Sequence, residues 1–293
     1  MGRRVALIGA TGQLAYDLRR AWAEHAPEDQ LIGLTHAEVE VADLNSGRAI
    51  LETIRPTLVV NTSAYHKVDV VEENTDRAVA VNAMGPRNLA LACRGLDAVL
   101  MHMSTDYVFS GRKAAPYVEA DPVDPVNVYG VSKAGGENFV RYLWPKHFIV
   151  RCSGLYGVAG SSGKGGNFVE LMLRLALRGG PIRVVDDQTL TPTATRALAA
   201  QIAELSRTTS YGTYHATCQG QCTWFEFAAE IFRQARVSPP LYPQTTADSG
   251  AKARRPGYSV LENENLKRLG LDRMPPWQEA LAEYLAERTA TRA

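Results

Sequence analysis

Cysteine is scarce in this chain, and it does not occur in the pattern of a zinc site. The four cysteines, Cys93, Cys152, Cys218 and Cys222, form no Cys-x-x-Cys pair. Paired cysteines at that spacing are the usual sequence signal of structural zinc. We therefore expect reduced thiols and no bound metal.

Long apolar runs and an excess of one charge are also missing. No apolar stretch approaches the roughly 20 residues that a membrane-spanning helix needs, and the apolar run at residues 5–8 is too short for a signal peptide. We therefore expect no membrane partner and a cytoplasmic location. The 32 Lys and Arg residues balance 31 Asp and Glu residues. Nucleic acid is not an expected partner, because nothing in this balance favours a phosphate backbone.

The first half of the chain repeats short β-branched runs followed by segments with apolar residues at helical spacing. The expected strands are residues 5–8, 31–34, 58–61, 98–103 and 148–151, and the expected helices are residues 14–25, 44–54, 75–91 and 130–143. This alternation is typical of a parallel sheet covered by helices. We predict an α/β protein with a Rossmann-type, doubly wound parallel sheet.

The second half is less regular and indicates a smaller α/β lobe for the substrate. We expect helices at residues 168–177, 195–205, 224–235 and 277–288, a strand at 182–185 and a loop at 238–255. The expected boundary divides residues 1–151 from residues 152–293, and segments of the second part can return to the first domain.

A glycine-rich turn follows the first expected strand and opens a helix. It reads Gly9-Ala10-Thr11-Gly12-Gln13-Leu14-Ala15. Gly9 permits the tight turn, Gly12 lets a diphosphate approach the backbone, and the first helical turn offers free N–H groups to the anion. The alternative is an ordinary glycine turn between a strand and a helix. We favour an NAD(P)-binding domain in residues 1–151.

The end of the second expected strand bears on the choice of cofactor. An acidic residue usually lies there and holds the ribose 2′-hydroxyl of NAD. This chain has Gly33-Leu34-Thr35-His36, with no carboxylate before Glu38. We expect NADPH or NADH, with a slight preference for NADPH, because little repels a 2′-phosphate.

Tyr129 and Lys133 are the candidate proton-transfer pair. A spacing of four at the start of a helix places both side chains on one face. A nearby ammonium favours the phenolate, so we expect Lys133 to lower the pKa of Tyr129 from about 10. Taken alone, this spacing is more often a surface helix. In this chain the pair follows a glycine turn and then a polar strand end. This combination in this order favours a catalytic role for Tyr129 and Lys133.

Thr105 is the candidate third catalytic residue. It follows the expected strand at residues 98–103, at the sheet edge where open α/β proteins bind ligands. Its hydroxyl can donate a hydrogen bond to a substrate carbonyl while Tyr129 supplies a proton. Ser104 is the local alternative.

Several further stretches carry a resemblance that spans nearly the whole chain. They are residues 9–14, 61–69, 81–86, 104–109, 128–133, 167–169, 184–188, 192–193, 212–215 and 255–256. In these the chain resembles the dTDP-4-dehydrorhamnose reductases, extended short-chain dehydrogenase/reductases of the sugar-nucleotide type. The resemblance implies NAD(P)H-dependent reduction of the 4-keto group of a nucleotide sugar in deoxysugar biosynthesis. A homodimer remains open.

The resemblance also implies roles for individual residues. The catalytic residues would be Thr105, Tyr129 and Lys133. The cofactor would contact Gly9, Thr11, Gly12, Gln13, Leu14, Asp43, Leu44, Ala64, Tyr65, His66, Tyr129 and Lys133. The substrate would contact Thr105, Asp106, Gly154 and Asn167. Asp43 has an equally supported alternative role as the N-cap of the helix that follows it.

The chain departs from the family at Gly154, where the family usually has a tryptophan that packs against the sugar. Loss of that ring removes an apolar platform, so we expect weaker substrate specificity. The glycine-rich segment at residues 157–166 does not match a P-loop. We interpret it as a lid over the substrate, with a plain linker as the alternative.

Two other functions fit the same residues. One is an epimerase or dehydratase of nucleotide sugars that retains its nicotinamide through the cycle. The other is a non-catalytic regulatory subunit like that of methionine adenosyltransferase. The intact Tyr129 and Lys133 pair argues against the second.

Overall fold

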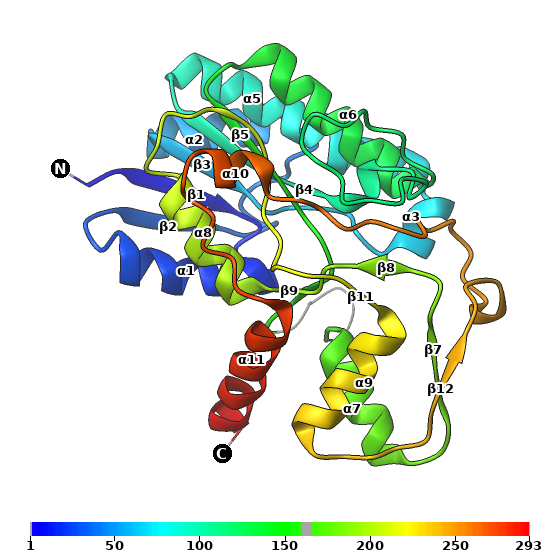
Figure 1. The fold of residues 1–293 in the computed structure, drawn as a ribbon. Helices are drawn as coiled ribbons and strands as arrows, with labels where there is room; N and C mark the ends of the chain where they lie inside the picture. The colour runs from blue at the N-terminus through cyan, green and yellow to red at the C-terminus, as the bar shows by residue number, and fades with distance from the viewer. Residues whose placement is uncertain (1, 160–165, 293) are drawn as a thin grey trace.

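A parallel sheet of six strands forms the centre of the protein. The computed structural model describes residues 2–159 and 166–292, and Figure 1 shows its sheet between two layers of helices. The strand order is β2-β1-β3-β4-β5-β10, and every neighbouring pair is parallel. The strands are β1 (Arg4–Ile8), β2 (Gln30–Leu34), β3 (Leu58–Asn61), β4 (Val99–Thr105), β5 (His147–Cys152) and β10 (Gly212–His215). The predicted α/β fold class is confirmed.

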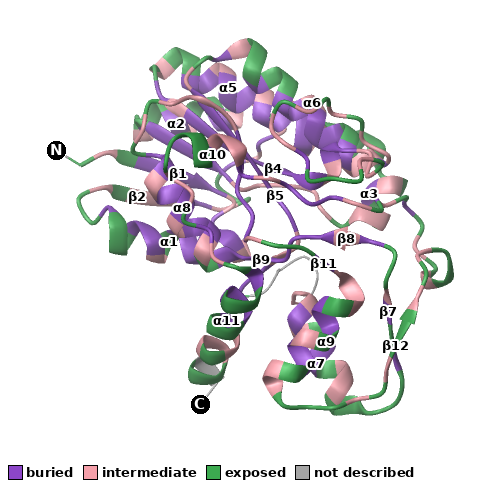
Figure 2. Ribbon diagram, in the orientation of Figure 1, coloured by how far each residue is buried: buried purple, intermediate pink, exposed green. Residues whose placement is uncertain are grey.

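The strands are apolar because helices cover both faces of the sheet, as the buried strands in Figure 2 show. Val5 and Leu7 pack into one core with α1 and α8, whereas Ala6 and Ile8 pack into a second core with α2 and α5. These helices are α1 (Gln13–His25), α8 (Thr195–Leu205), α2 (Leu44–Ile54) and α5 (Gly85–Leu96). Alternate side chains of one strand thus serve opposite layers.

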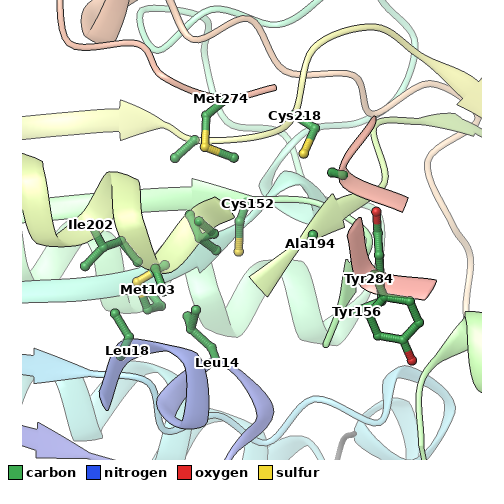
Figure 3. Packing of buried hydrophobic residues seen from close by; sticks show 14 of the residues in the cluster. Leu14, Leu18, Met103, Cys152, Tyr156, Ala194, Ile202, Cys218, Met274 and Tyr284 are labelled. Atoms are coloured by element: carbon green, nitrogen blue, oxygen red, sulfur yellow. The ribbon is translucent and has the colours of Figure 1, made fainter. Parts of the chain in front are cut away.

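The first core fixes the glycine turn against the carboxyl ends of β4 and β5. Figure 3 shows Leu14 and Leu18 of α1 on the side that faces Met103 and Cys152. All four residues are buried members of this core. The start of α1 is therefore held next to the strand ends that carry the polar residues.

One expected helix, at residues 75–91, is not a continuous α-helix. It consists of α4 (Thr75–Val79), a π-helical turn at Ala80–Met84, and α5, which runs on to Leu96. The π-helical turn contains Asn82, whose buried side chain bonds a neighbouring loop. π-Helical turns often occur at functional sites. The spacing of apolar residues in the sequence does not reveal them.

The chain after β5 builds the second, smaller group of elements and also returns to the sheet. β10 pairs with β5, and α8 packs on α1. Helices α7 (Phe168–Arg178), α9 (Trp224–Ala235) and α11 (Trp277–Arg292) lie below the sheet in Figure 1. Phe168 stacks on Phe227 with ring centroids 5.5 Å apart, and Trp277 meets Phe227 edge-on. Aromatic packing holds these helices together.

The loop expected at residues 238–255 is wrong in part. It contains β12 (Leu241–Gln244), which pairs in parallel with β7 (Ile182–Val185), and a 3-10 helix at Ala247–Ser249. Pro243 lies within this strand, although proline lacks the N–H that a central strand needs. Among the strands of the described residues, β12 neighbours β7 alone, so it tolerates the proline.

Short strand pairs complete the elements of the second half. β6 (Leu155–Tyr156) pairs with β9 (Thr193–Ala194), and β8 (Thr189–Leu190) pairs with β11 (Cys222–Thr223). Most of the segment interpreted as a lid, residues 160–165, lies outside the described residues. Within the described residues, no helix is long and apolar enough to cross a membrane.

Candidate active site

The glycine turn has the backbone geometry of a phosphate-binding loop. Gly9 follows β1 with a φ of 81°, and a Cβ there would lie 2.8 Å from the Thr62 hydroxyl oxygen. Gly12 is the N-cap of α1 and brings no side chain over the helix end. Thr11 is exposed, whereas Leu14 is buried in the core. The first amides of α1 have no preceding helical carbonyl, so they are available to an anion.

Gln13 supports the fit of a dinucleotide to this turn. Its Nε2 donates to the Leu155 carbonyl at 3.4 Å, but its buried Oε1 has no hydrogen-bond partner among the described residues. A buried acceptor without a donor is costly in a finished core. It is expected where a ligand supplies the donor. The turn and Gln13 therefore fit a dinucleotide cofactor.

The end of β2 carries both a carboxylate and a guanidinium. Glu38 folds back so that its Oε2 accepts from the Thr35 N–H and hydroxyl, each at 2.8 Å. These two hydrogen bonds lower the pKa of Glu38. The Arg19 guanidinium lies over Gly33, where a Cβ would be 2.0 Å from Nη2. Glu38 therefore brings a carboxylate to the end of β2, although it lies three residues after Thr35 in the sequence. The expectation that this strand end lacks an acid is wrong.

The loop after β3 is held by Asn82 from the π-helical turn. Asn82 Oδ1 accepts from the Tyr65 N–H at 2.8 Å, and its Nδ2 donates to the Tyr65 carbonyl at 2.9 Å. The same Nδ2 donates to the Ser132 hydroxyl of α6 (Val128–Leu143) at 3.0 Å. His66 folds back on the Ala64 carbonyl. This arrangement fixes the three predicted cofactor contacts of the loop against α6.

Asp43 and Leu44 lie at the start of α2, after the loop that follows β2. Asp43 is the N-cap of α2, and its Oδ1 accepts from the Asn45 N–H at 2.9 Å. Leu44 is the first residue of that helix and is half-buried. The capping role proposed as the alternative for Asp43 is observed.

Tyr129 lies in the first turn of α6, beside Thr105. The Thr105 hydroxyl lies close enough to the phenol to lower its pKa, against the larger effect of burial, and the Tyr129 ring meets Tyr107 edge-on with centroids 5.9 Å apart. Asn127 caps the helix by accepting from the Gly130 N–H at 2.8 Å. Gly130 allows the close approach, since a Cβ there would be 2.1 Å from the Tyr107 carbonyl oxygen. The helix start thus brings the predicted phenol to the end of β4.

Asp106 organises the hydroxyl groups around the end of β4. Thr105 donates to Asp106 Oδ1 at 2.9 Å, while Ser153 and Ser259 donate to Oδ2 at 2.8 and 2.6 Å. Burial raises the pKa of Asp106, against the effect of these donors. Because the Thr105 proton points to Asp106, the Thr105 hydroxyl can only accept from any other group. Direct donation to a substrate carbonyl requires its hydroxyl to rotate.

Ser104, the local alternative to Thr105, serves the opposite side of β4. Its hydroxyl donates to Glu137 Oε1 of α6 at 2.5 Å, inside the protein. Successive residues of a strand point to opposite faces. The structure therefore places Thr105, and not Ser104, on the side of β4 that faces Tyr129.

Lys133 is buried beneath the first turn of α6, with 2% of its surface exposed. Its Nζ donates to the Met103 carbonyl at 2.6 Å and lies 3.3 Å from His102 Nε2. Burial lowers the pKa of Lys133 to about 8, while the charge of Glu137 opposes this. Burial also raises the pKa of Tyr129 above its ordinary value. The expected lowering of the Tyr129 pKa by Lys133 is wrong, because desolvation outweighs any help from the ammonium.

Gly154 and Asn167 are engaged in local structure. Gly154 has a φ of 55°, and a Cβ would lie 2.8 Å from Leu190 Cδ1. The space that a side chain would take is therefore already filled. Asn167 caps α7 by accepting from the Glu170 N–H, and it donates to the Gly157 carbonyl at 2.8 Å. These contacts do not join Asn167 to Thr105, Tyr129 or Lys133.

Sequence reasoning missed three buried polar residues that surround the candidate catalytic group. They are Asn82, His102 and Glu137. His102 interrupts an otherwise apolar strand, and Glu137 lies one helical turn after Lys133 on the same face. For His102, its position inside an apolar strand was the signal that could have found it, because a buried polar group requires a partner.

Comparisons with known proteins agree with this geometry. The sequence profile of the family described as "RmlD substrate binding domain" matches residues 3–290. The chain is 38% identical to the spore coat polysaccharide biosynthesis protein SpsK of Bacillus subtilis, covering 98% of both chains. It is 38% identical to a dTDP-4-dehydrorhamnose reductase of Streptomyces griseus, covering 94% of this chain and 91% of the relative.

A solved structure shows the same fold over the whole length. It is a dTDP-4-dehydrorhamnose reductase from Bacillus anthracis in complex with NADP, with a TM-score of 0.92 and 38% identity, covering 98% of this chain and 100% of that one. The family match spans almost every described element, from β1 to α11. The chain therefore belongs to the dTDP-4-dehydrorhamnose reductase family, as the resemblance predicted.

Proposed function

We propose that this protein reduces the 4-keto group of a dTDP-linked sugar with NADPH or NADH. Its family contains reductases of such sugars. The observation that carries the proposal is that Tyr129 and Thr105 lie side by side at the carboxyl edge of the sheet. That edge, next to the glycine turn, is where Rossmann-type proteins bind nicotinamide cofactors and substrates.

The chain offers a consistent set of residues for holding the cofactor. Gly9, Thr11, Gly12, Gln13 and Leu14 would lie along its diphosphate. Asp43 and Leu44 would lie on the adenine side, and Ala64, Tyr65 and His66 on the β3 side. The reduced nicotinamide supplies the hydride when bound.

Tyr129 is the proposed proton donor. Burial raises the pKa of Tyr129, so the phenol keeps its proton at neutral pH. An alkoxide that forms from a ketone is more basic than a phenolate, so proton transfer from Tyr129 is favourable. Thr105 orients the phenol, and Asp106 in turn orients Thr105 through its 2.9 Å hydrogen bond. Lys133 would stabilise the phenolate that remains.

The substrate side is proposed to include Thr105, Asp106, Gly154 and Asn167. Asp106 is 4% exposed, with both oxygens in hydrogen bonds. Its role is therefore to orient the neighbouring hydroxyl groups around the sugar, and less to accept hydrogen bonds from the sugar itself. The four cysteines are buried and unpaired, which suits the proposed cytoplasmic location.

The test is to incubate the protein with NADPH and a panel of 4-keto nucleotide sugars. NADPH consumption is followed by absorbance, and the products are identified. We expect consumption with a dTDP-linked 4-keto sugar and one reduced sugar per NADPH. Tyr129→Phe should abolish turnover while leaving cofactor affinity largely unchanged, because only the proton donor is removed.

Two outcomes would overturn the proposal. A changed sugar without net NADPH consumption would favour the epimerase or dehydratase alternative. No turnover with any sugar, together with tight binding to another protein, would favour the regulatory subunit.

A further inference from the structure

The first turn of α6, which carries Tyr129, is held by a side chain from another helix. The backbone N–H of Val128 donates to Glu72 Oε2 at 3.0 Å, and Glu72 belongs to α3 (Val68–Glu73). Val128 is the first residue of α6, so no carbonyl of the helix receives its N–H. Figure 1 shows α3 beside α6. Glu72 therefore supplies an acceptor that α6 itself does not have.

Asn127 joins the same turn to a distant part of the chain. Its Oδ1 accepts from the Gly130 N–H at 2.8 Å, while its Nδ2 donates to the Arg254 carbonyl at 2.7 Å. Arg254 belongs to residues 252–259, a segment that we call the strap. Asn127 is buried, so water has little access to these groups. One side chain thus caps α6 and attaches it to the strap.

α3 holds the strap as well. Asp69 Oδ1 accepts from the N–H groups of Lys252 and Ala253 at 3.1 and 3.0 Å. Its Oδ2 accepts from Arg255 Nη2 at 2.8 Å, and this hydrogen bond holds the pKa of Asp69 below its ordinary value. Asp69 and Glu72 are three residues apart, a spacing that places both on one face of the helix. That face therefore contacts α6 and the strap together.

These contacts close a ring of three segments. α3 binds the first turn of α6 through Glu72, and that turn binds the strap through Asn127. The strap binds α3 through Asp69. Because each segment is bonded to both of the others, none can shift without breaking hydrogen bonds to two neighbours. Linked hydrogen bonds of this kind restrain the turn more than one bond alone.

The strap also reaches the groups around Tyr129. Its Ser259 donates to Asp106 Oδ2 at 2.6 Å, at the end of β4. Burial, and next the charge of Asp106, raise the pKa of Tyr107, whereas the nearby charge of Arg255 opposes this rise. Tyr107 in turn packs edge-on against Tyr129. The ring of segments therefore borders the proposed proton donor on more than one side.

We infer that Glu72 and Asp69 are positioning residues for Tyr129. Their hydrogen bonds are made to the backbone of α6 and to the strap, so they act through these segments. Proton transfer requires the phenol to lie within hydrogen-bond distance of the reacting oxygen, and small displacements of a catalytic group cost large factors in rate. Their effect on turnover rests on the proposed function, whereas the ring of hydrogen bonds does not.

The alternative is that α3 only stabilises the fold. In that case its carboxylates would change the free energy of unfolding without changing kcat of the folded protein. The helix offers a matched control in Glu73, which is exposed and pairs with Lys252 Nζ at 2.5 Å. This ion pair joins α3 to the strap at the surface, where such pairs contribute little.

The test compares Glu72→Ala, Glu72→Gln and Glu73→Ala. Steady-state rates are measured with NADPH and a 4-keto dTDP-sugar, and backbone hydrogen exchange is measured by mass spectrometry. Glu72→Ala should lower kcat about 10- to 100-fold and change the KM for NADPH little, because the glycine turn is untouched. Exchange in residues 126–133 should become about tenfold faster or more, since a hydrogen bond to a charged acceptor is lost.

The two other variants separate positioning from simple loss of stability. Glu72→Gln keeps an acceptor oxygen at the same reach, so it should restore slow exchange in residues 126–133. It should also return kcat to within about fivefold of the unchanged protein, because only a charge at a helix N-terminus is lost. Glu73→Ala should leave both kcat and this exchange unchanged.

Unchanged exchange in residues 126–133 of Glu72→Ala would overturn the inference. So would a loss of kcat that Glu73→Ala reproduces or that Glu72→Gln does not relieve. If Glu72→Ala does not fold, Asp69→Ala decides. We expect faster exchange both in the strap and in residues 126–133, and an effect confined to the strap would count against the inference.

The exchange measurements need no substrate. Absent turnover in the unchanged protein would therefore refute the proposed function by itself. The exchange of residues 126–133 would still show whether Glu72 and Asp69 hold the first turn of α6.

Discussion

Arg151 and Glu137 form a fully buried ion pair, with Arg151 Nη2 2.7 Å from Glu137 Oε2 and Nε 2.9 Å from Oε1. Ser104 and Arg141 donate to the same carboxylate. Burial raises the pKa of Glu137, but these donors prevail and lower it. The pair ties α6, which carries Tyr129 and Lys133, to β5.

Removing one partner of this pair should be costly. Arg151→Met leaves a buried carboxylate with weaker compensation, so we expect a loss of about 3–5 kcal/mol in the free energy of unfolding. Urea unfolding measures the loss. The double variant Arg151→Met with Glu137→Gln is the control, and it should lose less than the single variant. Equal losses would show that the unpaired charge does not matter.

The same pair gives a pH dependence of stability. The folded-state pKa of Glu137 is lowered, so its contribution is complete above the unfolded-state value of about 4.3 and disappears as pH falls through the folded-state value. Unfolding of the unchanged protein and of Glu137→Gln should be compared between neutral and acidic pH. We expect the stability difference between them to shrink as pH falls below about 4. A constant difference would contradict this assignment.

Gly154 should not accept the tryptophan that its family usually has there. Its φ of 55° is unfavourable for other residues, and Leu190 lies 2.8 Å from the position of a Cβ. Gly154→Ala should cost about 1–3 kcal/mol of unfolding free energy, and Gly154→Trp should cost more. Gly154→Ala should cost less in a Leu190→Ala background than in the unchanged protein, because the contact with Leu190 is then absent. An equal cost in both backgrounds would mean that backbone strain alone sets the cost.

The sequence was informative where a local pattern determines structure. The five predicted strands and the glycine turn were found because buried parallel strands are continuously apolar and a Gly9 turn needs a positive φ. Thr105 and Tyr129 were predicted from the ends of such elements, and the structure places them at the end of β4 and the start of α6. In these places the conformation and surroundings of each residue depend mainly on its neighbours in the sequence.

The sequence was less informative where partners come from distant segments. Glu38 reaches the end of β2 only by folding back on Thr35. The raised pKa of Tyr129 depends on burial by surrounding elements. The contact of Gly154 with Leu190 and the closure of the sheet by β10 likewise join residues far apart in the chain. None of these relationships has a periodic signature.

Asn82 should be required for cofactor affinity. Its side chain satisfies both the N–H and the carbonyl of Tyr65, so Asn82→Ala leaves these groups unpaired and should cost about 1–3 kcal/mol of stability. The loop that contains Ala64, Tyr65 and His66 would lose the two hydrogen bonds that hold Tyr65 in place. We expect a higher dissociation constant for NADPH, measured by fluorescence titration. Ser132→Ala is the control, because it removes only the bond to α6 and should affect affinity less.

Glu38 and Arg19 should control the choice between NADPH and NADH in opposite directions. The Glu38 carboxylate is ionised at neutral pH, because two hydrogen bonds from Thr35 lower its pKa, and it would repel a 2′-phosphate at the end of β2. Arg19, which forms no ion pair with a carboxylate of residues 2–159 or 166–292, would attract the phosphate. Glu38→Gln should therefore raise the ratio of kcat/KM for NADPH over NADH, and Arg19→Gln should lower it, each by about five- to tenfold, equivalent to roughly 1–1.4 kcal/mol. Initial rates with both cofactors measure the ratios, and similar shifts in the same direction for both variants would contradict opposed roles.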